Sequence, residues 1–246
     1  MGNKSRRNFR KNKKKHIKSR KKIYLGGAIF NTSSKTTEML NDLNALLRKK
    51  CNNLELRVGM MTEMTGEIYA YSRKLKNSIL ICLYYNNDCI SSIQLMQDDD
   101  GNIELRSFTD RTYEGNKYNT LLRNILIVIG NTIMFKDKPI IKVMSYATNP
   151  ISAHLIMKNF NIFPSLVDSY GNKTDISYFM DKYKQDGKTG DINTIVQEFY
   201  KSNNSVPIAF EIPLTDEGLI NQSFDKIKIL VGEIDADNVD KQIKCP

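Results

Sequence analysis

The spacing of apolar residues near the start of the chain predicts a strand followed by an amphipathic helix. Residues 22–30 favour a strand. Residues 34–50 repeat apolar side chains at helical spacing and end on a basic turn, which suits the helix dipole. The apolar positions are Met39, Leu40, Leu43, Leu46 and Leu47. Residues 60–75 are also expected to be helical.

Three runs rich in strand-forming residues follow, and short polar turns join them. The runs cover residues 78–85, 89–97 and 103–110, and the turns cover residues 86–88 and 98–102. Strand-like runs joined by turns of about three to five residues form hairpins. The sequence therefore predicts a three-stranded antiparallel meander.

A longer helical pattern begins at residue 118 and keeps its apolar residues on one broad face. We therefore expect a buried helix that ends at Lys138-Pro139. The face comprises Tyr118, Leu121, Leu122, Ile125, Leu126, Ile129, Ile133 and Met134. Residues 140–147 then predict an apolar strand, and residues 151–160 predict a second helix after a turn at Thr148-Asn149-Pro150.

The last third of the chain carries weaker signals. Residues 190–202 favour a helix, residues 206–214 a strand and residues 235–246 a loose polar end. The chain has 246 residues, 40% of them hydrophobic, which is enough for one substantial core.

Positive charge is concentrated at the N-terminus. The formal net charge is +10, and residues 1–22 hold 12 Lys and Arg and no acidic residue. The rest of the chain has 25 basic and 27 acidic residues. So basic a segment, with almost no apolar residues, is expected to be a disordered arm that binds nucleic acid, an anionic membrane or an acidic protein. A solubilising or targeting tail without a fixed partner is the alternative.

The cysteines and histidines do not indicate a metal site. The four cysteines show no C-x-x-C spacing, and the chain has two histidines. We therefore predict no metal, and thiols that stay reduced. No apolar run approaches transmembrane length, and the basic N-terminal region is too long for a good secretory signal. These features favour an intracellular protein, in the cytoplasm or the nucleus.

The segment before the buried helix is a candidate phosphate-binding loop. Gly115 permits a tight turn, the first amides of the helix carry partial positive charge, and Lys117 and Arg123 add cations. A pyrophosphate could lie against residues 115–120. The alternative is that Gly115 only supplies a turn and that Arg123 is a solvated surface residue.

The order of the predicted elements, the hairpins before this loop and the Asn-containing turn after the next strand resemble the GNAT superfamily of N-acetyltransferases. The resemblance covers residues 76–165 well, and residues 23–75 in element order alone. It implies an α/β (α+β) fold, with a mixed, mainly antiparallel central sheet flanked by helices. The chain would then comprise the arm, a GNAT-like core at 23–165, and the C-terminal part of the fold with an extension at 166–246.

The resemblance also implies a binding site for acetyl-CoA. In that superfamily the amides of a Q/R-x-x-G-x-G/A segment hold the pyrophosphate, and the next strand splays away so that the pantetheine arm lies in the gap. Here Gly115 falls on the first glycine, whereas Lys117 and Asn119 stand where later glycines are common. The implied cofactor-binding residues are Arg111, Gly115, Asn116, Lys117, Tyr118, Asn119, Asn149 and Ser152.

The strand before the loop offers two candidate general bases, Glu104 and Asp110. Either could take a proton from an amine, directly or through water. A solvent-facing carboxylate is the alternative for each. Ile156 stands where the superfamily often has a Tyr general acid. Because a thiolate is a fair leaving group, direct transfer can survive the loss of that Tyr.

Two functions remain open from the sequence. The first is an acetyl-CoA-dependent N-acetyltransferase that transfers an acetyl group to an amine. The second is a GNAT-like binding module that has lost catalysis and is tethered through its arm to nucleic acid or another polyanion. Attachment of the arm to a membrane surface is a weaker third reading. Proteins with this fold often pair, so a homodimer is also an expectation of the resemblance.

Overall fold

The structure is a computed structural model, and it describes residues 30–61, 78–98, 100–147, 150–160, 165–167, 173–175, 194, 196–198 and 208–234. Several expectations fall outside these residues. They concern the arm at 1–22, nearly all of the helix at 60–75 and of the strand at 22–30, most of the helix at 190–202, Asn149, and the polar end at 235–246.

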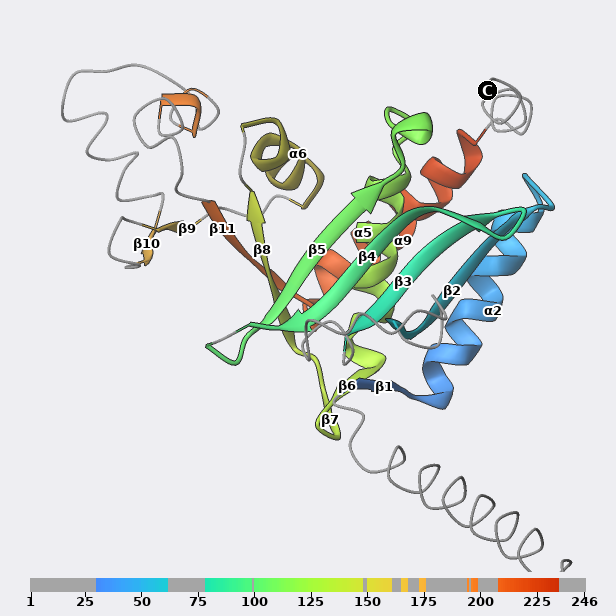
Figure 1. Ribbon diagram of the computed structural model, residues 1–246, viewed down its shortest axis with the longest axis horizontal. Coiled ribbons are helices and arrows are strands. Elements are labelled where there is room, and N and C mark those ends of the chain that lie inside the picture. Colours follow the sequence, from blue (N-terminus) through green and yellow to red (C-terminus); the bar gives the residue numbers. More distant parts are fainter. Residues whose placement is uncertain are drawn as a thin grey trace, which may run out of the picture.

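An eight-stranded sheet forms the centre of the described fold (Figure 1). Its strand order is β10-β9-β11-β8-β5-β4-β3-β2. The strands are β2 (Leu54–Met60), β3 (Ile79–Tyr85), β4 (Asp88–Gln97), β5 (Ile103–Thr109), β8 (Lys142–Ala147), β9 (Ser165–Val167), β10 (Lys173–Asp175) and β11 (Ile208–Pro213). Neighbouring strands are antiparallel, except that β5 and β8 are parallel. The expected α+β class, with a mainly antiparallel sheet, is confirmed.

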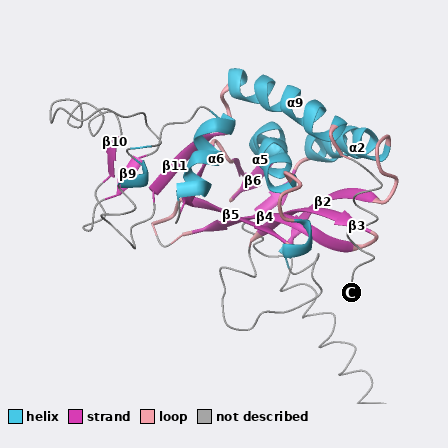
Figure 2. Ribbon diagram, turned by 90° about the horizontal axis from the view of Figure 1, so that it is seen from above, coloured by secondary structure: helices cyan, strands magenta, loops and turns pink. Residues whose placement is uncertain are grey.

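The helices lie over one face of this sheet (Figure 2). They are α2 (Ser34–Arg48), α5 (Tyr118–Ile129), α6 (Pro150–Phe160) and α9 (Glu217–Gly232). A small second sheet, made of β1 (Phe30–Thr32), β6 (Ile133–Phe135) and β7 (Lys138–Pro139), lies at one end of the same core. There the rings of Phe30 and Phe135 pack with centroids 5.0 Å apart.

The predicted meander is confirmed and gains a strand that the sequence analysis missed. Strand β2 pairs with β3 along its whole length, from Leu54 opposite Tyr85 to Met60 opposite Ile79. The turn between β3 and β4 is also shorter than expected. Only Asn86 and Asn87 form it, with φ of 49° and 73°, which is the left-handed geometry that tight hairpins prefer.

The buried helix is confirmed but ends earlier than the apolar pattern indicated. Helix α5 stops at Ile129, and residues 130–132 form a 3-10 turn. The Thr132 hydroxyl donates to the Ile129 carbonyl at 2.6 Å and so helps to close the helix. Ile133 and Met134 belong to β6, where Met134 pairs with Asn31 of β1. Both residues are apolar and follow α5 at helical spacing, so the sequence pattern extended the predicted helix to them.

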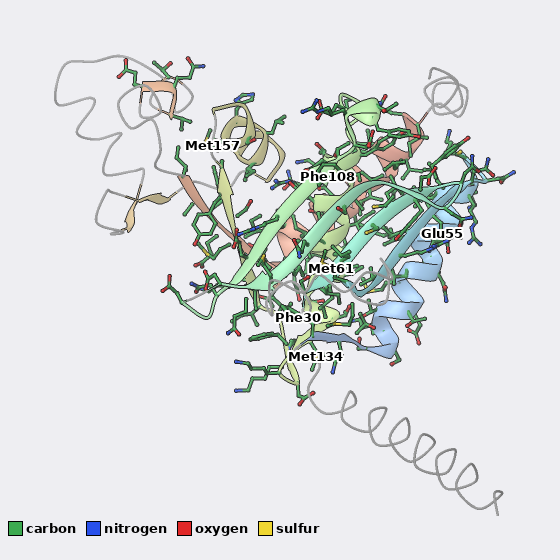
Figure 3. All side chains as sticks on the ribbon, viewed as in Figure 1. Phe30, Glu55, Met61, Phe108, Met134 and Met157 are labelled. Atoms are coloured by element: carbon green, nitrogen blue, oxygen red, sulfur yellow. The ribbon has the colours of Figure 1, made fainter. Side chains whose placement is uncertain are left out.

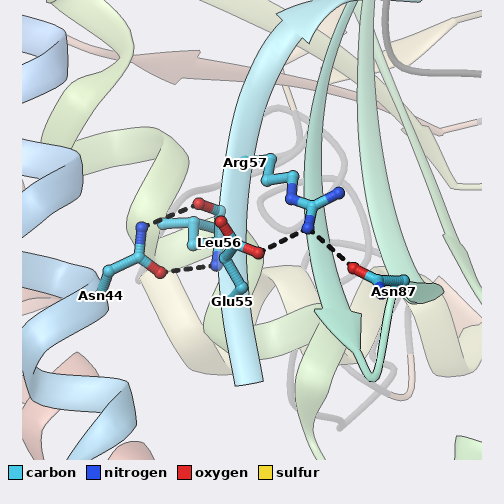
Figure 4. A network of polar contacts seen from close by, with 5 residues as sticks. All are labelled: Asn44, Glu55, Leu56, Arg57 and Asn87. Atoms are coloured by element: carbon cyan, nitrogen blue, oxygen red, sulfur yellow. Dashed lines mark hydrogen bonds and ion pairs between the residues drawn. The ribbon is translucent and has the colours of Figure 1, made fainter. Parts of the chain in front are cut away.

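One side chain of helix α2, that of Asn44, hydrogen-bonds to the edge strand of the large sheet (Figure 4). The Asn44 amide donates to the Leu56 carbonyl at 2.9 Å and accepts from the Leu56 N–H at 2.7 Å. Strand β2 is the last strand in the sheet order, so its outer backbone groups have no strand partner. Asn44 therefore satisfies two of them. On the same strand, Arg57 pairs with Glu55 at 2.6 Å and donates to Asn87 at 3.1 Å.

Helix α9 was not predicted from the sequence. Its N-terminus is capped by Asp216, whose carboxylate accepts from the Leu219 N–H at 2.8 Å. The helix packs along α5 and completes the cover of the core. The C-terminal part of the chain thus contributes both a strand, β11, and a helix to the same fold.

Candidate functional site

Strands β5 and β8 pair with each other over only two residues of each strand. Their parallel pairing comprises Glu104 with Met144 and Leu105 with Ser145. Beyond these two pairs, β5 continues to Thr109 and β8 to Ala147 without pairing to each other. Figure 1 shows the two strands diverging toward their C-terminal ends, with α6 following β8. A splay of this kind was expected from the resemblance described above.

A pocket of about 280 Å³ lies at this splay, on the face of the sheet that the helices cover. It is bounded by the end of β5, the first turns of α5 and the middle of α6. Its lining residues are Ser107, Thr109, Glu114, Asn119, Thr120, Arg123, Ser152, Leu155 and Ile156. Figure 3 labels Phe108 on β5 and Met157 on α6, two of the elements that form its walls. The lining is rich in hydroxyl groups, with apolar side chains contributed by α6.

Arg123 is the cation of this lining, and its side chain contacts both of the splayed strands. Its Nη2 donates to Ser107 Oγ on β5 at 2.9 Å, and its Nη1 to Ser145 Oγ on β8 at 3.5 Å. Its Nε donates to Asn119 Oδ1, one turn earlier on α5, at 2.8 Å. Burial lowers the pKa of Arg123 to about 10, so the side chain stays protonated at neutral pH. Arg123 is therefore not the solvated surface residue that the sequence left open.

The loop between β5 and α5 has the backbone geometry of a tight turn. Asp110 caps a short 3-10 turn at residues 111–113 by accepting from the Thr112 N–H at 2.9 Å. Gly115 has φ of +85°, and Lys117, which precedes the helix, has φ of 61°. The Lys117 side chain does not cap the first turn of α5.

The predicted cofactor-binding residues are only partly brought together. Asn119 and Ser152 line the pocket. Lys117 instead forms an ion pair with Glu233 beyond the end of α9, with Nζ and Oε2 2.9 Å apart. The Tyr118 ring is buried in the core beside Tyr113. Arg111, Gly115 and Asn116 lie in the loop outside the lining, and Asn149 lies outside the described residues.

The two predicted carboxylates do not line the pocket. Side chains alternate along a strand, so Glu104 points to the face opposite Ser107 and Thr109. There it forms an ion pair with Arg106 through two contacts, of 2.9 and 3.2 Å. Asp110 is engaged as the cap described above. The carboxylate in the lining is that of Glu114, which the sequence analysis did not single out.

Ser107 and Thr109 were also missed, although a signal for them existed. They continue the alternation that begins with the buried residues Ile103 and Leu105, so a register argument alone would have placed them on the helix-covered face. No comparable signal marked Thr120. Its place in the lining depends on how α5 is set against β5.

Within the described part of the chain, no group of three or more His, Cys, Asp or Glu side chains is placed to hold a metal ion. No helix among the described residues has the length and apolar character needed to cross a lipid bilayer.

Comparisons with known proteins add little to this picture. No family model matches the chain, and no curated protein matches it. Among solved structures, it is similar to a protein of unknown function from Aquifex aeolicus VF5, at 10% sequence identity and with a TM-score of 0.26. That match covers 82% of this chain and 98% of the other.

Proposed function

We propose that this protein is an acetyl-CoA-dependent N-acetyltransferase that transfers an acetyl group to an amine. The observation that carries the proposal is the pocket at the splay of β5 and β8, next to the first turn of α5. The superfamily that the sequence resembles opens its cofactor cleft at the equivalent pair of strands.

The proposed cofactor runs from the loop to the point where the strands separate. Its pyrophosphate lies at the N-terminus of α5, where backbone amides and the helix dipole favour an anion. Gly115 carries no Cβ, and no protein atom lies within 4 Å of where one would stand, so the space beside the backbone is open to a ligand. The pantetheine arm then passes between Asn119 and Ser152, from opposite walls of the pocket.

In the proposed reaction the amine nitrogen attacks the thioester carbonyl carbon. The C–S bond then breaks, and CoA leaves as the thiolate. Glu104 is our proposed acceptor of the amine proton, with an amine that approaches from the open face of the sheet. The backbone of Glu104 lies in the last paired stretch of β5 and β8, beside the point where the strands separate. Asp110 is the second candidate, and its use would require release of the Thr112 cap.

Calorimetric titration of acetyl-CoA into the full-length protein tests the proposal. High ionic strength is needed, because the basic arm attracts any phosphate-rich ligand and salt screens that attraction. We expect saturable binding at one site and its loss in Ser152→Trp, which places an indole in the pocket. His154→Trp is the matched control, since His154 is exposed on the same helix and is absent from the lining. Equal binding by both variants would contradict the proposed site.

A second function, polyanion binding through residues 1–22, is favoured by the charge of the arm. It predicts DNA affinity that falls steeply as salt rises. Replacement of half of the arm's Lys and Arg residues by Ser should reduce both the affinity and the salt slope. An unchanged affinity in that variant would argue against this function. It would leave the acetyltransferase proposal untouched.

A further inference from the structure

The surroundings of Arg123 differ from those of the two arginines on strands of the large sheet. Arg57 and Arg106 each pair with a carboxylate two residues earlier on their own strand, Glu55 at 2.6 Å and Glu104 at 2.9 Å. Arg123, in contrast, donates only to the neutral oxygens of Asn119, Ser107 and Ser145 among the described residues. Among the described residues no carboxylate contacts Arg123, and Glu114, the acidic residue of the same pocket lining, is not one of its partners.

An uncompensated cation in a partly buried position is unfavourable. Burial lowers the pKa of Arg123, and no neighbouring carboxylate opposes that effect. A protein that keeps such a charge beside a pocket has a site that gains from an anion, because the ligand supplies the missing counter-charge. The pocket adjoins the guanidinium directly, since Arg123 is part of its lining.

The guanidinium also has hydrogen-bonding capacity left. It carries five N–H groups, two on each Nη and one on Nε. The three described contacts use one group on each nitrogen. One N–H on each Nη is left over, so the guanidinium can still donate two hydrogen bonds to an anion. Because Ser107 accepts from the guanidinium and lines the pocket, its own hydroxyl can donate to an anion there.

The position of Arg123 indicates which end of the ligand it meets. Asn119 lies in the first turn of α5, beside the proposed pyrophosphate site, and Arg123 lies one turn further along the helix. Arg123 contacts Ser145, a member of the last parallel pair, so its guanidinium lies where the strands separate. A CoA thioester with its phosphates at the loop would bring its acyl end to this point.

We propose that Arg123, with Ser107, binds a carboxylate on the acyl group, so that the preferred donor is the CoA thioester of a dicarboxylic acid. The inference rests on the proposed function and narrows its donor from acetyl-CoA to a longer, anionic acyl-CoA. A phosphate group of CoA itself is the other anion that could reach the guanidinium, and the experiment below separates the two.

The test compares three ligands by calorimetry with the full-length protein at high ionic strength. They are CoA, acetyl-CoA and succinyl-CoA, and the last adds a terminal carboxylate. We expect succinyl-CoA to bind roughly tenfold to a hundredfold more tightly than acetyl-CoA, as a charge-assisted pair of hydrogen bonds supplies. In Arg123→Met the preference should disappear, while acetyl-CoA still binds. Arg123→Lys should keep part of it, because a lysine keeps the charge but not the two-pronged geometry.

Arg57→Met is the matched control. It removes the same side chain from β2, far along the sheet from the pocket, and should leave the preference unchanged. Thermal unfolding of each variant shows whether it is folded. The comparison of acetyl-CoA with succinyl-CoA in wild-type protein does not depend on any variant being folded.

Each other result overturns the inference in a distinct way. If wild-type protein binds acetyl-CoA and succinyl-CoA equally, no carboxylate site exists and the acetyltransferase proposal survives. If Arg123→Met weakens all three ligands to the same extent, Arg123 binds a phosphate of CoA. If folded wild-type protein binds none of the three ligands, the proposed function itself fails, and the inference fails with it.

Discussion

Gly130 lies directly against the side chain of Leu214. A Cβ at residue 130 would be 2.6 Å from Leu214 Cδ1 and 3.2 Å from Cδ2, which is closer than side chains approach one another. Leu214 is fully buried where the chain leaves β11, so it has little room to move. The end of α5 therefore depends on the absence of a side chain at this position.

We expect Gly130→Ala to lower the free energy of unfolding by about 1–3 kcal/mol, the usual effect of overpacking. Urea unfolding measures this. In a Leu214→Ala background the added methyl group should be tolerated, so the two substitutions should show favourable coupling in a double-mutant cycle. Gly232→Ala is the control, since a Cβ there meets no atom within 4 Å. A penalty for Gly130→Ala that persists without the Leu214 side chain would rule out the steric explanation.

A side chain at position 115 would be disfavoured by the backbone conformation and not by a lack of space. Its φ is +85°, and the volume around a Cβ at this position is empty. Gly115→Ala should destabilise the protein by about 1 kcal/mol, because an L-residue is strained in this region. Gly115→Asn should have a smaller effect, since Asn tolerates left-handed backbone better. Thermal unfolding of the two variants side by side checks the order, and equal effects would contradict it.

Asn44 should contribute to stability through its two bonds to the Leu56 backbone. We expect Asn44→Ala to lower the free energy of unfolding by about 1–3 kcal/mol, because it leaves two partly buried backbone groups without a partner. Asn41→Ala is the matched control on the same helix, since Asn41 is exposed. Both changes gain the same helix propensity, so the difference between their urea midpoints isolates the contacts with β2.

Tyr118 should make the protein sensitive to alkali. Burial raises the pKa of Tyr118 from 10.0 to about 12. The folded state therefore favours the neutral phenol, and this contribution is fully present below the unfolded pKa of 10.0. It is lost as pH rises from 10.0 to about 12, by roughly 3 kcal/mol in all. Tyr118→Phe should flatten this part of the curve of unfolding free energy against pH. An unchanged curve would count against the shift.

The meander and the buried helix could be predicted from the sequence because the spacing of apolar residues alone indicates them. Strand β2 was missed although residues 54–60 alternate apolar and non-apolar side chains strictly, which is a signal for a half-buried strand. Helix α9 gave a weaker signal. Its buried positions are four residues apart, and one of them is the polar residue Ser223. In both elements the burial depends on contacts with distant parts of the chain.

The site was predicted less well than the fold. The loop was located from Gly115 and the helix that follows it, and its turn geometry agrees with that interpretation. The contacts of individual side chains could not be predicted in the same way. Lys117 was predicted to be a phosphate ligand. In the folded protein it pairs with Glu233, which follows it by 116 positions in the sequence. The contacts of Arg123 with Ser107 and Ser145 depend on two strands that meet only in the folded sheet.

The packing of α5 against α9 also has a consequence for how the chain is made. Nine of the residues in α5 are buried, and α9, which covers part of them, is the last described element of the chain. While the ribosome is still synthesising residues 130–216, one side of this apolar helix has no partner. Nascent chains should thus expose an apolar surface until α9 has been synthesised, and truncated products that lack α9 should be recognised by chaperones or aggregate.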